Sequence, residues 1–498
     1  MRLDYLLKGL SIQEHHGNVN IEIKGLTNDS RAVKKGYLFV AVKGSNQDGH
    51  RYLAHAVQKG AHALVVEDVE RIFRGVTIVR LPDTRVALSE LAARFYNYPA
   101  KGMNLIGITG TNGKTTTSYL LESILKEAGR KVGVIGSISY RFKGKSHRAS
   151  LTTPESTDLM EIITEMRDAG VTDIIVEVSS HSLDQGRTRG LDWSRALFTN
   201  FSRDHLDYHS TMEEYFKAKS LLFYSLGEDK DRDQVAVINM DDPKGRVLEE
   251  ITKVSVVSYG LGDNCLLRAT DIETDAGGLS FRLVTSSGYV PISSSLLGQI
   301  NVYNILGAAA TAFSINIDLE IIARGIKRLT CVPGRLQPVK NKRGLSMFVD
   351  YAHSPDALEK VLQILRQLTK GKLITVFGCG GDRDRGKRPD MGRVAGKYSD
   401  LAIITSDNPR GEDPAEIADD IELGMKGSGL RRIELGLPGK ERGYEIILNR
   451  RKAIHAAVNV AKKEDIVLIA GKGHENYQII GDRKRHFDDV EEAALAAR

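Results

Sequence analysis

The stretch IGITGTNGKTTTSYLLESIL, residues 106–125, decides the fold of the central part of the chain. Apolar residues enter a turn that contains Gly110 and Gly113, and Lys114 then opens a run of helix-forming residues. Glycines let backbone amides approach a phosphate, and the N-terminus of a helix favours an anion. The spacing departs from the common GxxxxGK[ST] pattern, because the position of its first glycine is Ile108. Strand, loop and helix still follow in order, which predicts a nucleotide phosphate site.

Length and composition are those of a globular protein with several cores. At roughly 100–200 residues per domain, a chain of 498 residues predicts three or four domains. A hydrophobic content of 41% with 27% charged residues excludes wholesale disorder. The net charge is only +6, from 70 basic and 64 acidic residues, so charge gives no reason to expect a nucleic-acid or membrane partner.

The cysteines and the apolar runs indicate the compartment. Cys265, Cys331 and Cys379 lie far apart without a CxxC pair, which is typical of a reducing compartment and predicts neither disulfides nor zinc. No apolar run reaches the roughly 18 residues of a membrane span, and the N-terminus lacks the apolar core of a signal peptide. We therefore expect a cytoplasmic protein, and we expect it to be a monomer.

Alternating strand and helix patterns predict an α/β protein of three domains. We expect a small N-terminal α/β domain over residues 1–100, a central P-loop ATPase domain with a mostly parallel sheet over 101–333, and a C-terminal Rossmann-like α/β domain over 334–498. Pro333 and Gly334 mark the last boundary.

Each domain has its own set of patterns. The N-terminal block predicts strands at 37–42, 61–67 and 76–81 and helices at 50–60 and 84–100. The central block predicts buried strands at 103–109, 131–138, 173–180, 195–200 and 234–240, and three short strands between Leu266 and Ile292 predict a small antiparallel patch. The C-terminal block predicts strands at 345–352, 372–378, 401–407 and 465–471, with functional loops at their carboxyl ends.

Acidic and basic residues follow two of the central strands. Glu177 ends one strand, where a carboxylate beside a phosphate loop is a suitable magnesium ligand together with a threonine hydroxyl. His205 follows the next strand among acids, and it is a second candidate ligand, although imidazole is a less usual partner for magnesium. His209 has the weaker claim. Lys217 and Lys219 have the pattern of a solvated helix face, so the residues alone place neither in the site.

Asn301 and Asn304 enter an apolar helix, where helix capping is the simplest role for them. Asp350 follows a strand of the C-terminal block, at the start of a polar turn.

Three loops of the C-terminal block carry complementary charges. The segment 376–389 has a glycine turn followed by Arg383, Arg385, Lys387 and Arg388, a pattern that favours anion recognition. The segment 405–414 sets Asp407 near Arg410, which suits an ammonium and a carboxylate of one zwitterion. The segment 469–478 adds a lysine and Glu475. Loops of this kind at one edge of a sheet predict a pocket for a charged small molecule.

Together these motifs resemble those of the Mur ligase family, the ATP-dependent amide-forming enzymes of peptidoglycan precursor synthesis. The resemblance rests on an ordered set that spans nearly the whole chain: TNDSR, GTNGKTTT, LTTPES, EVSSHSL, TNFSRDHLDYH, NVYN, VPGR, VDYAHSPD, GCGGDRDRGKRP, SDNPR and GKGHE. The chain most resembles the members that add meso-2,6-diaminopimelate to UDP-N-acetylmuramoyl-L-alanyl-D-glutamate, because the DNPR motif is associated with diaminopimelate in the family.

The resemblance assigns residues to each ligand. The ATP-binding residues would be Gly110, Thr111, Asn112, Gly113, Lys114, Thr115, Thr116, Asn301, Arg335 and Asp350. The UDP-sugar substrate would contact Ser30, Thr152, Thr153, Ser179, Gln185 and Arg187. The diaminopimelate would contact Arg383, Asp407, Asn408, Pro409, Arg410, Gly471 and Glu475.

The resemblance also implies a Mg²⁺ cofactor, held by Thr115, Glu177 and His205, and a catalytic set of Lys114, Lys219, Glu177 and His205. Lys219 would be modified to N6-carboxylysine, which reverses the interpretation from the residues alone. The implied reaction is activation of a carboxylate as an acyl phosphate, followed by attack of an amine. Three alternatives stay open: a lysine-adding ligase, a folylpolyglutamate synthase that shares the ATPase core, and a non-catalytic nucleotide switch.

Overall fold

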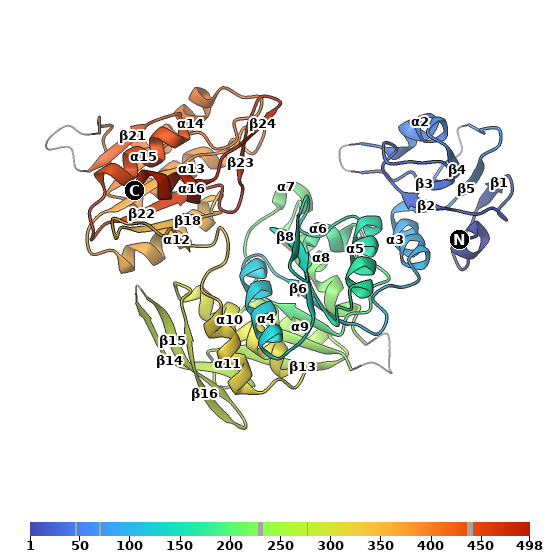
Figure 1. The fold of residues 1–498 in the computed structure, drawn as a ribbon, viewed down its shortest axis with the longest axis horizontal. Helices are drawn as coiled ribbons and strands as arrows, with labels where there is room; N and C mark the ends of the chain where they lie inside the picture. The colour runs from blue at the N-terminus through green and yellow to red at the C-terminus, as the bar shows by residue number, and fades with distance from the viewer. Residues whose placement is uncertain (45–46, 69–70, 228–232, 276, 436–441) are drawn as a thin grey trace. The chain divides into compact units, whose positions relative to one another are not determined.

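The computed structural model describes residues 1–44, 47–68, 71–227, 233–275, 277–435 and 442–498 (Figure 1). The chain forms two compact units. One comprises residues 1–270, 282–291 and 303–328, and the other comprises 271–281, 292–302 and 329–498. Within the described ranges, no helix combines the length and the apolar character needed to cross a bilayer.

The N-terminal part of the first unit is a five-stranded sheet in the order β1-β5-β4-β3-β2. Its strands are β1 (Glu14–His16), β2 (Gly25–Thr27), β3 (Tyr37–Val40), β4 (Ala61–Val66) and β5 (Thr77–Arg80). Its helices are α1 (Leu3–Leu6), η1 (Gly49–Tyr52), α2 (Leu53–Gln58) and α3 (Thr84–Phe95). The predicted strands and helices are confirmed, whereas β1 and β2 are three residues long, too short for a periodic pattern.

An eleven-stranded sheet follows, in the order β16-β15-β14-β13-β12-β11-β6-β10-β7-β8-β9. Its strands are β6 (Asn104–Thr109), β7 (Val132–Ile135), β8 (Ser139–Phe142), β9 (Lys145–Arg148), β10 (Asp173–Glu177), β11 (Arg195–Phe198), β12 (Val235–Asn239), β13 (Ser255–Gly260), β14 (Leu267–Asp275), β15 (Gly278–Thr285) and β16 (Gly288–Ser294). The strands from β13 to β7 pair in parallel, as predicted. The strands β14 to β16 continue this sheet in sequence order, because β14 pairs with β13.

The helices that follow these strands are α4 (Lys114–Glu127), α5 (Ser156–Asp168), α6 (Ser180–Asp184), α7 (Leu206–His209), α8 (Met212–Tyr224), α9 (Pro243–Ile251), α10 (Ile300–Phe313) and α11 (Leu319–Arg328). Helix α11 packs closely on α4, where Ser123 donates a hydrogen bond of 2.6 Å to the carbonyl oxygen of Gly325. Parallel strands with helical crossovers gather their carboxyl ends at one edge of the sheet, which is where α/β proteins bind ligands.

The second unit contains a six-stranded sheet in the order β17-β18-β22-β19-β20-β21. Its strands are β17 (Gln337–Pro338), β18 (Ser346–Asp350), β19 (Leu373–Phe377), β20 (Leu401–Ile404), β21 (Gly443–Ile446) and β22 (Ile466–Ala470), and a separate hairpin consists of β23 (Tyr477–Ile480) and β24 (Arg483–His486). All strands from β18 to β21 pair in parallel.

Helices cover both faces of this sheet. One core cluster takes residues from α12 (Pro355–Leu368), α13 (Lys387–Tyr398) and α14 (Pro414–Lys426), and the other takes residues from α15 (Arg450–Val460) and α16 (Asp489–Ala496). The predicted open α/β sheet is therefore confirmed.

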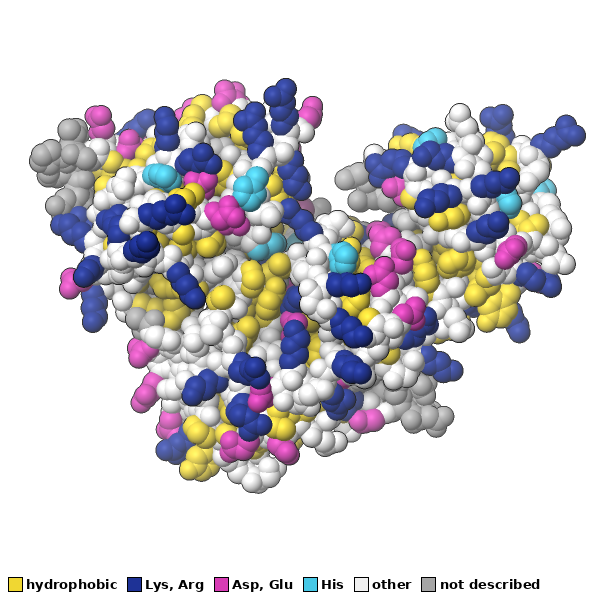
Figure 2. Space-filling view, in the orientation of Figure 1, with side chains coloured by type: hydrophobic (Ala, Val, Ile, Leu, Met, Phe, Trp, Pro, Cys, Tyr) yellow, Lys and Arg dark blue, Asp and Glu magenta, His cyan; other side chains and the backbone are white. Residues whose placement is uncertain are grey.

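The surface carries mixed charges. Figure 2 shows Lys and Arg side chains over all parts of the face in view, with Asp and Glu among them. This arrangement agrees with the small net charge of +6.

Candidate active site

The phosphate loop connects β6 to α4, and its backbone requires glycine at two positions. Gly110 has φ of +143° and Gly113 has φ of +87°, where L side chains are strained. A Cβ at Gly110 would also collide with the side chain of Thr199, and one at Gly113 with Asn304. Among the residues that the structure describes, no side chain caps the N-terminus of α4, so its first amides are available to an anion.

Asn200, which lies two residues after the end of the neighbouring strand β11, holds the loop in place. The Asn200 carbonyl oxygen accepts from the amide of Thr111 at 2.8 Å, and its side-chain oxygen accepts from the amide of Asn112 at 3.0 Å. The Lys114 ammonium folds over the loop and donates to the carbonyl oxygens of Gly110 at 2.7 Å and Thr111 at 2.9 Å. The loop therefore has the backbone conformation and the nearby cation that the predicted phosphate site requires.

Glu177 lies at the carboxyl end of β10, next to the phosphate loop, because β10 pairs with β6 in the register Glu177 to Ile108. Its side chain is buried and accepts hydrogen bonds from Thr115 at 2.8 Å, Ser137 at 2.8 Å and Ser118 at 3.2 Å. Three rotatable hydroxyls around one carboxylate can make room for a hard divalent cation.

No group of three or more His, Cys, Asp and Glu gathers as a metal site among the residues that the structure describes. Glu177 and Thr115 still fit magnesium, which proteins commonly hold through one or two carboxylates together with substrate phosphates and water.

Lys219 is buried, in contrast to the solvated position that its pattern suggested. Helix α8 packs this side against β6, and the Lys219 ammonium donates 2.9 Å to the Gly110 carbonyl oxygen, whereas Lys217 is exposed. Burial and the nearby Lys114 ammonium hold the pKa of Lys219 well below its usual value, against a weaker raising effect of Asp204. A lysine of this kind is neutral more readily than a surface lysine, so it is a better nucleophile.

His205 precedes α7 with φ of +53° and lies among other rings. Its ring centroid is 5.0 Å from that of His181 and 5.8 Å from that of Tyr215. Burial lowers the pKa of His205, and it lowers the pKa of His181 to about 4, so both rings favour the neutral form. His209 is buried and its Nε2 contacts Ser180 Oγ at 2.9 Å, which gives it a structural role.

The residues assigned to the UDP-sugar lie together beside Glu177, with one exception. Thr153 donates to the Glu177 carbonyl oxygen at 2.8 Å, and Arg187 donates to the Thr153 carbonyl oxygen at 3.1 Å. The network continues through hydrogen bonds of Thr152 with Ser137, Thr153 with Ser179, and Arg187 with Gln185. Ser30 lies in the N-terminal sheet domain instead, where its hydroxyl contacts His55 Nδ1 at 3.0 Å.

Three residues assigned to the nucleotide belong to the second unit. A cavity of about 320 Å³ is lined by Asn301, Arg335 and apolar residues around β18. Asp350 ends β18 and accepts from the amides of Leu336 at 2.7 Å and Ala352 at 2.8 Å. Burial raises the pKa of the Asp350 carboxyl, against the opposing effect of Arg335.

The capping interpretation of the two asparagines is wrong. Helix α10 begins at Ile300, so Asn301 and Asn304 both lie inside it. Asn301 donates from Nδ2 to the Leu297 carbonyl oxygen at 2.7 Å.

The loops after β20 and β22 meet around the residues assigned to diaminopimelate. Asn408 donates from Nδ2 to Glu475 Oε2 at 3.0 Å, and Asp407 lies against Gly471. Arg410 has φ of +52°, and its backbone pairs with the hairpin residue Ile480. Its guanidinium donates to the Gly381 carbonyl oxygen at 2.7 Å and forms no ion pair within the described ranges. This cation can therefore still meet a carboxylate.

Only part of the loop after β19 fits the anion-recognition hypothesis. Arg388 is buried and pairs with Glu412 at 2.9 Å and Asp420 at 3.0 Å, so it stabilises the fold instead. Arg385 also pairs with Glu412, at 2.9 Å. Arg383 is exposed and forms no ion pair in the described part of the chain, which leaves it accessible to a ligand.

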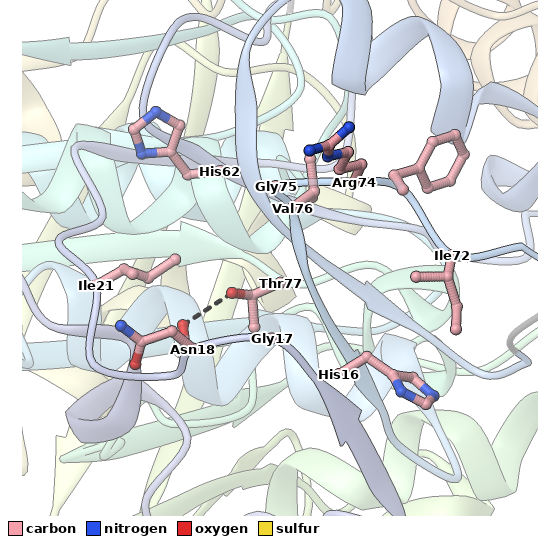
Figure 3. A pocket seen from close by; sticks show the side chains of 11 residues that line it. His16, Gly17, Asn18, Ile21, His62, Ile72, Arg74, Gly75, Val76 and Thr77 are labelled. Carbon is pink, nitrogen blue, oxygen red and sulfur yellow. Dashed lines mark hydrogen bonds between the residues drawn. The ribbon is translucent and has the colours of Figure 1, made fainter.

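A separate cavity of about 410 Å³ lies in the N-terminal domain, lined by His16, His62, Arg74 and neighbouring residues. Figure 3 shows Thr77 at its wall, with its hydroxyl bonded to the Asn18 carbonyl oxygen at 2.8 Å. None of the residues assigned to a ligand lines it, so this cavity is not part of the predicted site.

The sequence patterns did not indicate Ser137, and they indicated Lys472 only as part of a charged loop, without its burial. Ser137 bridges Glu177 and Thr152, and its only signal is its place at the end of the predicted strand 131–138. Lys472 is buried among Asp407, Asn408 and Glu475, whereas its pattern is that of a polar turn. The contacts of Ser137 and Lys472 join loops that follow different strands, so the folded structure is needed to recognise them.

Comparisons with known proteins agree along the whole chain. Family models match the Mur ligase middle domain at residues 108–312, the Mur ligase glutamate ligase domain at 334–473 and the Mur ligase family catalytic domain at 22–96. The UDP-N-acetylmuramoyl-L-alanyl-D-glutamate--2,6-diaminopimelate ligase of Geobacter metallireducens is 47% identical over 503 residues, covering 100% of this chain and 98% of that protein.

Solved structures give the same result. A structure of a ligase of the same name is 34% identical with a TM-score of 0.66, covering 95% of this chain and 94% of that one. The MurF ligase of Thermotoga maritima in complex with ADP is 18% identical with a TM-score of 0.61, covering 95% of this chain and 96% of that one, which shows the shared three-domain fold alone.

Proposed function

Because the chain belongs to the Mur ligase family, we propose that it is an ATP-dependent ligase that adds meso-2,6-diaminopimelate to UDP-N-acetylmuramoyl-L-alanyl-D-glutamate. The observation that carries this proposal is full-length similarity to ligases of that name, at 47% identity. The reaction is a step of peptidoglycan precursor synthesis, and so serves cell-wall formation, cell shape and division.

The reaction has two steps. The γ-carboxylate of the D-glutamyl group attacks the γ-phosphorus of ATP, a carboxyl O–P bond forms, and the bond to ADP breaks. The amine of diaminopimelate then attacks the acyl carbon, the tetrahedral intermediate expels inorganic phosphate, and the amine loses a proton as the amide forms. Lys114 and the amides of residues 110–116 stabilise the negative charge on the transferred phosphoryl group.

Magnesium, when bound, neutralises phosphate oxygens as a Lewis acid. Thr115, Glu177 and His205 would hold it. Lys219, buried with a lowered pKa, is suited to attack carbon dioxide as a neutral amine and become N6-carboxylysine with loss of a proton. Its new carboxylate would replace a cation beside Lys114 with an anion, which offsets the repulsion between the two lysines.

The other proposed site residues bind either the UDP-sugar substrate or diaminopimelate. The UDP-sugar contacts Ser30 and the connected group Thr152, Thr153, Ser179, Gln185 and Arg187. The acids Asp407 and Glu475 face the ammonium of diaminopimelate, and Arg383 and Arg410 face its carboxylates. Asn408, Pro409 and Gly471 shape the loops between them.

We also propose that the protein acts in the cytoplasm as a monomer, with the domains 1–100, 101–333 and 334–498. The three free cysteines Cys265, Cys331 and Cys379 support a reducing compartment.

One experiment tests the proposal against its alternatives. The protein is incubated with ATP, magnesium and the UDP-muramoyl dipeptide, with meso-diaminopimelate or L-lysine offered separately, and phosphate and tripeptide are measured. We expect tripeptide only with diaminopimelate, because lysine lacks the second carboxylate for Arg410. Equal or better use of lysine would make it a lysine-adding ligase. Phosphate without any tripeptide would favour a nucleotide switch. In a parallel incubation with a folate and glutamate, glutamate addition would favour the synthase.

A further inference from the structure

Lys472, two residues after the end of β22, is a buried lysine that joins two ligand loops. Its side chain is 0% exposed. Its Nζ lies 3.1 Å from Asn408 Oδ1, 3.2 Å from Glu475 Oε2 and 3.5 Å from Asp407 Oδ1. An ammonium has three N–H donors, and these three oxygens can use all of them. One side chain therefore connects the loop after β20 to the loop after β22.

Lys472 also compensates the charge of both loops. The side chains of Asp407 and Glu475 are only 8% and 17% exposed, so water screens them poorly. Within the described ranges, Lys472 is the only cation at ion-pair distance from either carboxylate. Arg450 lies in the same core, but its partner is Asp489 at 2.7 Å, with both side chains fully buried. Two buried acids without Lys472 would repel each other, because like charges in a poorly screened site disfavour one another.

The contact with Lys472 fixes the orientation of Asn408. The Asn408 side-chain oxygen accepts from Lys472 and from the amide of Ile479 at 3.0 Å, while Nδ2 donates to Glu475. The reversed amide would place its NH₂ against two donors. Glu475 is held at its other oxygen by the hydroxyl of Tyr477 at 3.2 Å. Lys472 is therefore the contact that Asp407, Asn408 and Glu475 share, beside the separate contacts that Ile479 and Tyr477 provide.

We propose that Lys472 is a positioning residue that sets the affinity for the incoming diamino acid without touching it. The proposal rests on the proposed function in that Asp407, Asn408 and Glu475 bind this substrate. An ammonium ligand needs carboxylates that are ionised and aimed to within about 0.5 Å. Lys472 favours the ionised form of the carboxylates and holds their orientation. Its own side chain is fully buried, so it lies beneath the binding surface.

The test compares Lys472→Met, which removes the charge at similar length, with Lys472→Arg, which keeps it. The matched control is Lys484→Met. Both lysines lie over the Tyr477 ring, Lys472 at 5.3 Å and Lys484 at 3.9 Å, but Lys484 is exposed. We expect Lys472→Met to raise KM for diaminopimelate by about tenfold to a hundredfold, the range for losing a buried charged hydrogen bond. KM for ATP and for the UDP-dipeptide stays unchanged, Lys472→Arg recovers part of the loss, and the control matches the native protein.

A double variant separates positioning from general stability. If Lys472 acts through Glu475, adding Lys472→Met to Glu475→Gln raises KM for diaminopimelate by much less than it does alone. Unchanged kinetics in Lys472→Met would overturn the proposal. So would a parallel rise of all three KM values, or a loss of folding in thermal melts that Lys472→Arg does not prevent. If instead the native protein makes no tripeptide at all, the proposed function fails, whatever the variants do.

Discussion

At the scale of single residues, the site contains two side chains of usually exposed, charged types that are buried. Glu177 is a carboxylate that is 1% exposed and held by hydroxyls, and Lys219 is a lysine that is 1% exposed. Burial disfavours the charged form of an isolated group. Buried charged groups are therefore typical of functional sites, where a ligand or a modification compensates the charge. We therefore expect both to be sensitive to small changes.

Lys219→Ala should abolish most of the ligase activity, because no carboxylated lysine can form. Short carboxylates such as acetate should restore part of it by occupying the vacated space. The measurement is tripeptide formation at increasing carboxylate concentration. Lys217→Ala, two positions away and exposed, is the control and should be unaffected. Full activity of Lys219→Ala without added carboxylate would remove this residue from the site.

Ser137→Ala should lower activity about tenfold and raise the magnesium concentration for half-maximal rate, since residues that orient a metal ligand commonly contribute that much. The reason is the lost 2.8 Å hydrogen bond to Glu177. Ser123→Ala removes a hydroxyl that bonds Gly325 on α11 instead, so it serves as the control. Equal losses in both variants would mean that the effect is one of stability alone.

At the scale of elements, the ligand loops follow the carboxyl ends of parallel strands and are held from the side. The start of α13 is fastened to the loop after β20, because Arg388 bonds both oxygens of Glu412, at 2.9 and 3.0 Å. These bonds, a hydrogen bond from the Asp382 amide and the charge of Arg385 lower the pKa of the Glu412 carboxyl to about 2. A lowered carboxyl pKa means that the ionised form stabilises the folded state above its unfolded pKa of about 4.3.

Glu412→Gln should lower the melting temperature at pH 7, and it should flatten the dependence of melting temperature on pH. In the native protein the stabilisation by Glu412 is present above about pH 4.3 and is lost as pH falls toward about 2. The variant has no carboxyl to protonate in this window. The measurement is thermal unfolding from pH 7 to pH 2. Asp390→Asn, which breaks an exposed pair with Arg393 on the same helix, is the control, and a loss as large as that of Glu412→Gln would contradict the argument.

At the scale of the whole molecule, the residues assigned to the ligands divide between two units. The phosphate loop and the UDP-sugar residues belong to the first unit, and the amino-acid loops belong to the second. A ligand that binds only the folded protein stabilises it, by about 2.7 kcal/mol at a hundredfold excess over Kd. The rise in melting temperature caused by each substrate therefore measures binding at the site of that substrate.

Lys114→Met should abolish the rise in melting temperature caused by ATP with magnesium and leave the rise caused by the UDP-dipeptide intact. Lys126→Met, on the exposed side of the same helix α4, should keep both. Thermal unfolding of the full chain with each ligand separately measures this. Loss of both rises in Lys114→Met would show that the variant disturbs the fold of the first unit and not only phosphate binding.

Most of the fold follows from local patterns. The apolar residues 174–176 belong to a strand that is buried on both faces, so a single sequence reveals such a strand. The short strand β1 lacks such a pattern, since it pairs with β5, which is distant in sequence. The strands β2, β23 and β24 are three or four residues long, and they also lack a long run of apolar residues.

The sequence by itself determined the phosphate loop, the order of strands and helices, and the resemblance to one ligase family, because these depend on residues adjacent in the chain. Only the tertiary structure decided that Lys219 and Lys472 are buried, that Ser137 bonds Glu177 and that Arg388 is committed to an ion pair. The physical reason is that burial and charge compensation depend on neighbours in space. Strand ends that lie 40 to 65 residues apart in the chain supply those neighbours here, as in the bonds of Ser137 with Glu177 and of Lys472 with Asp407.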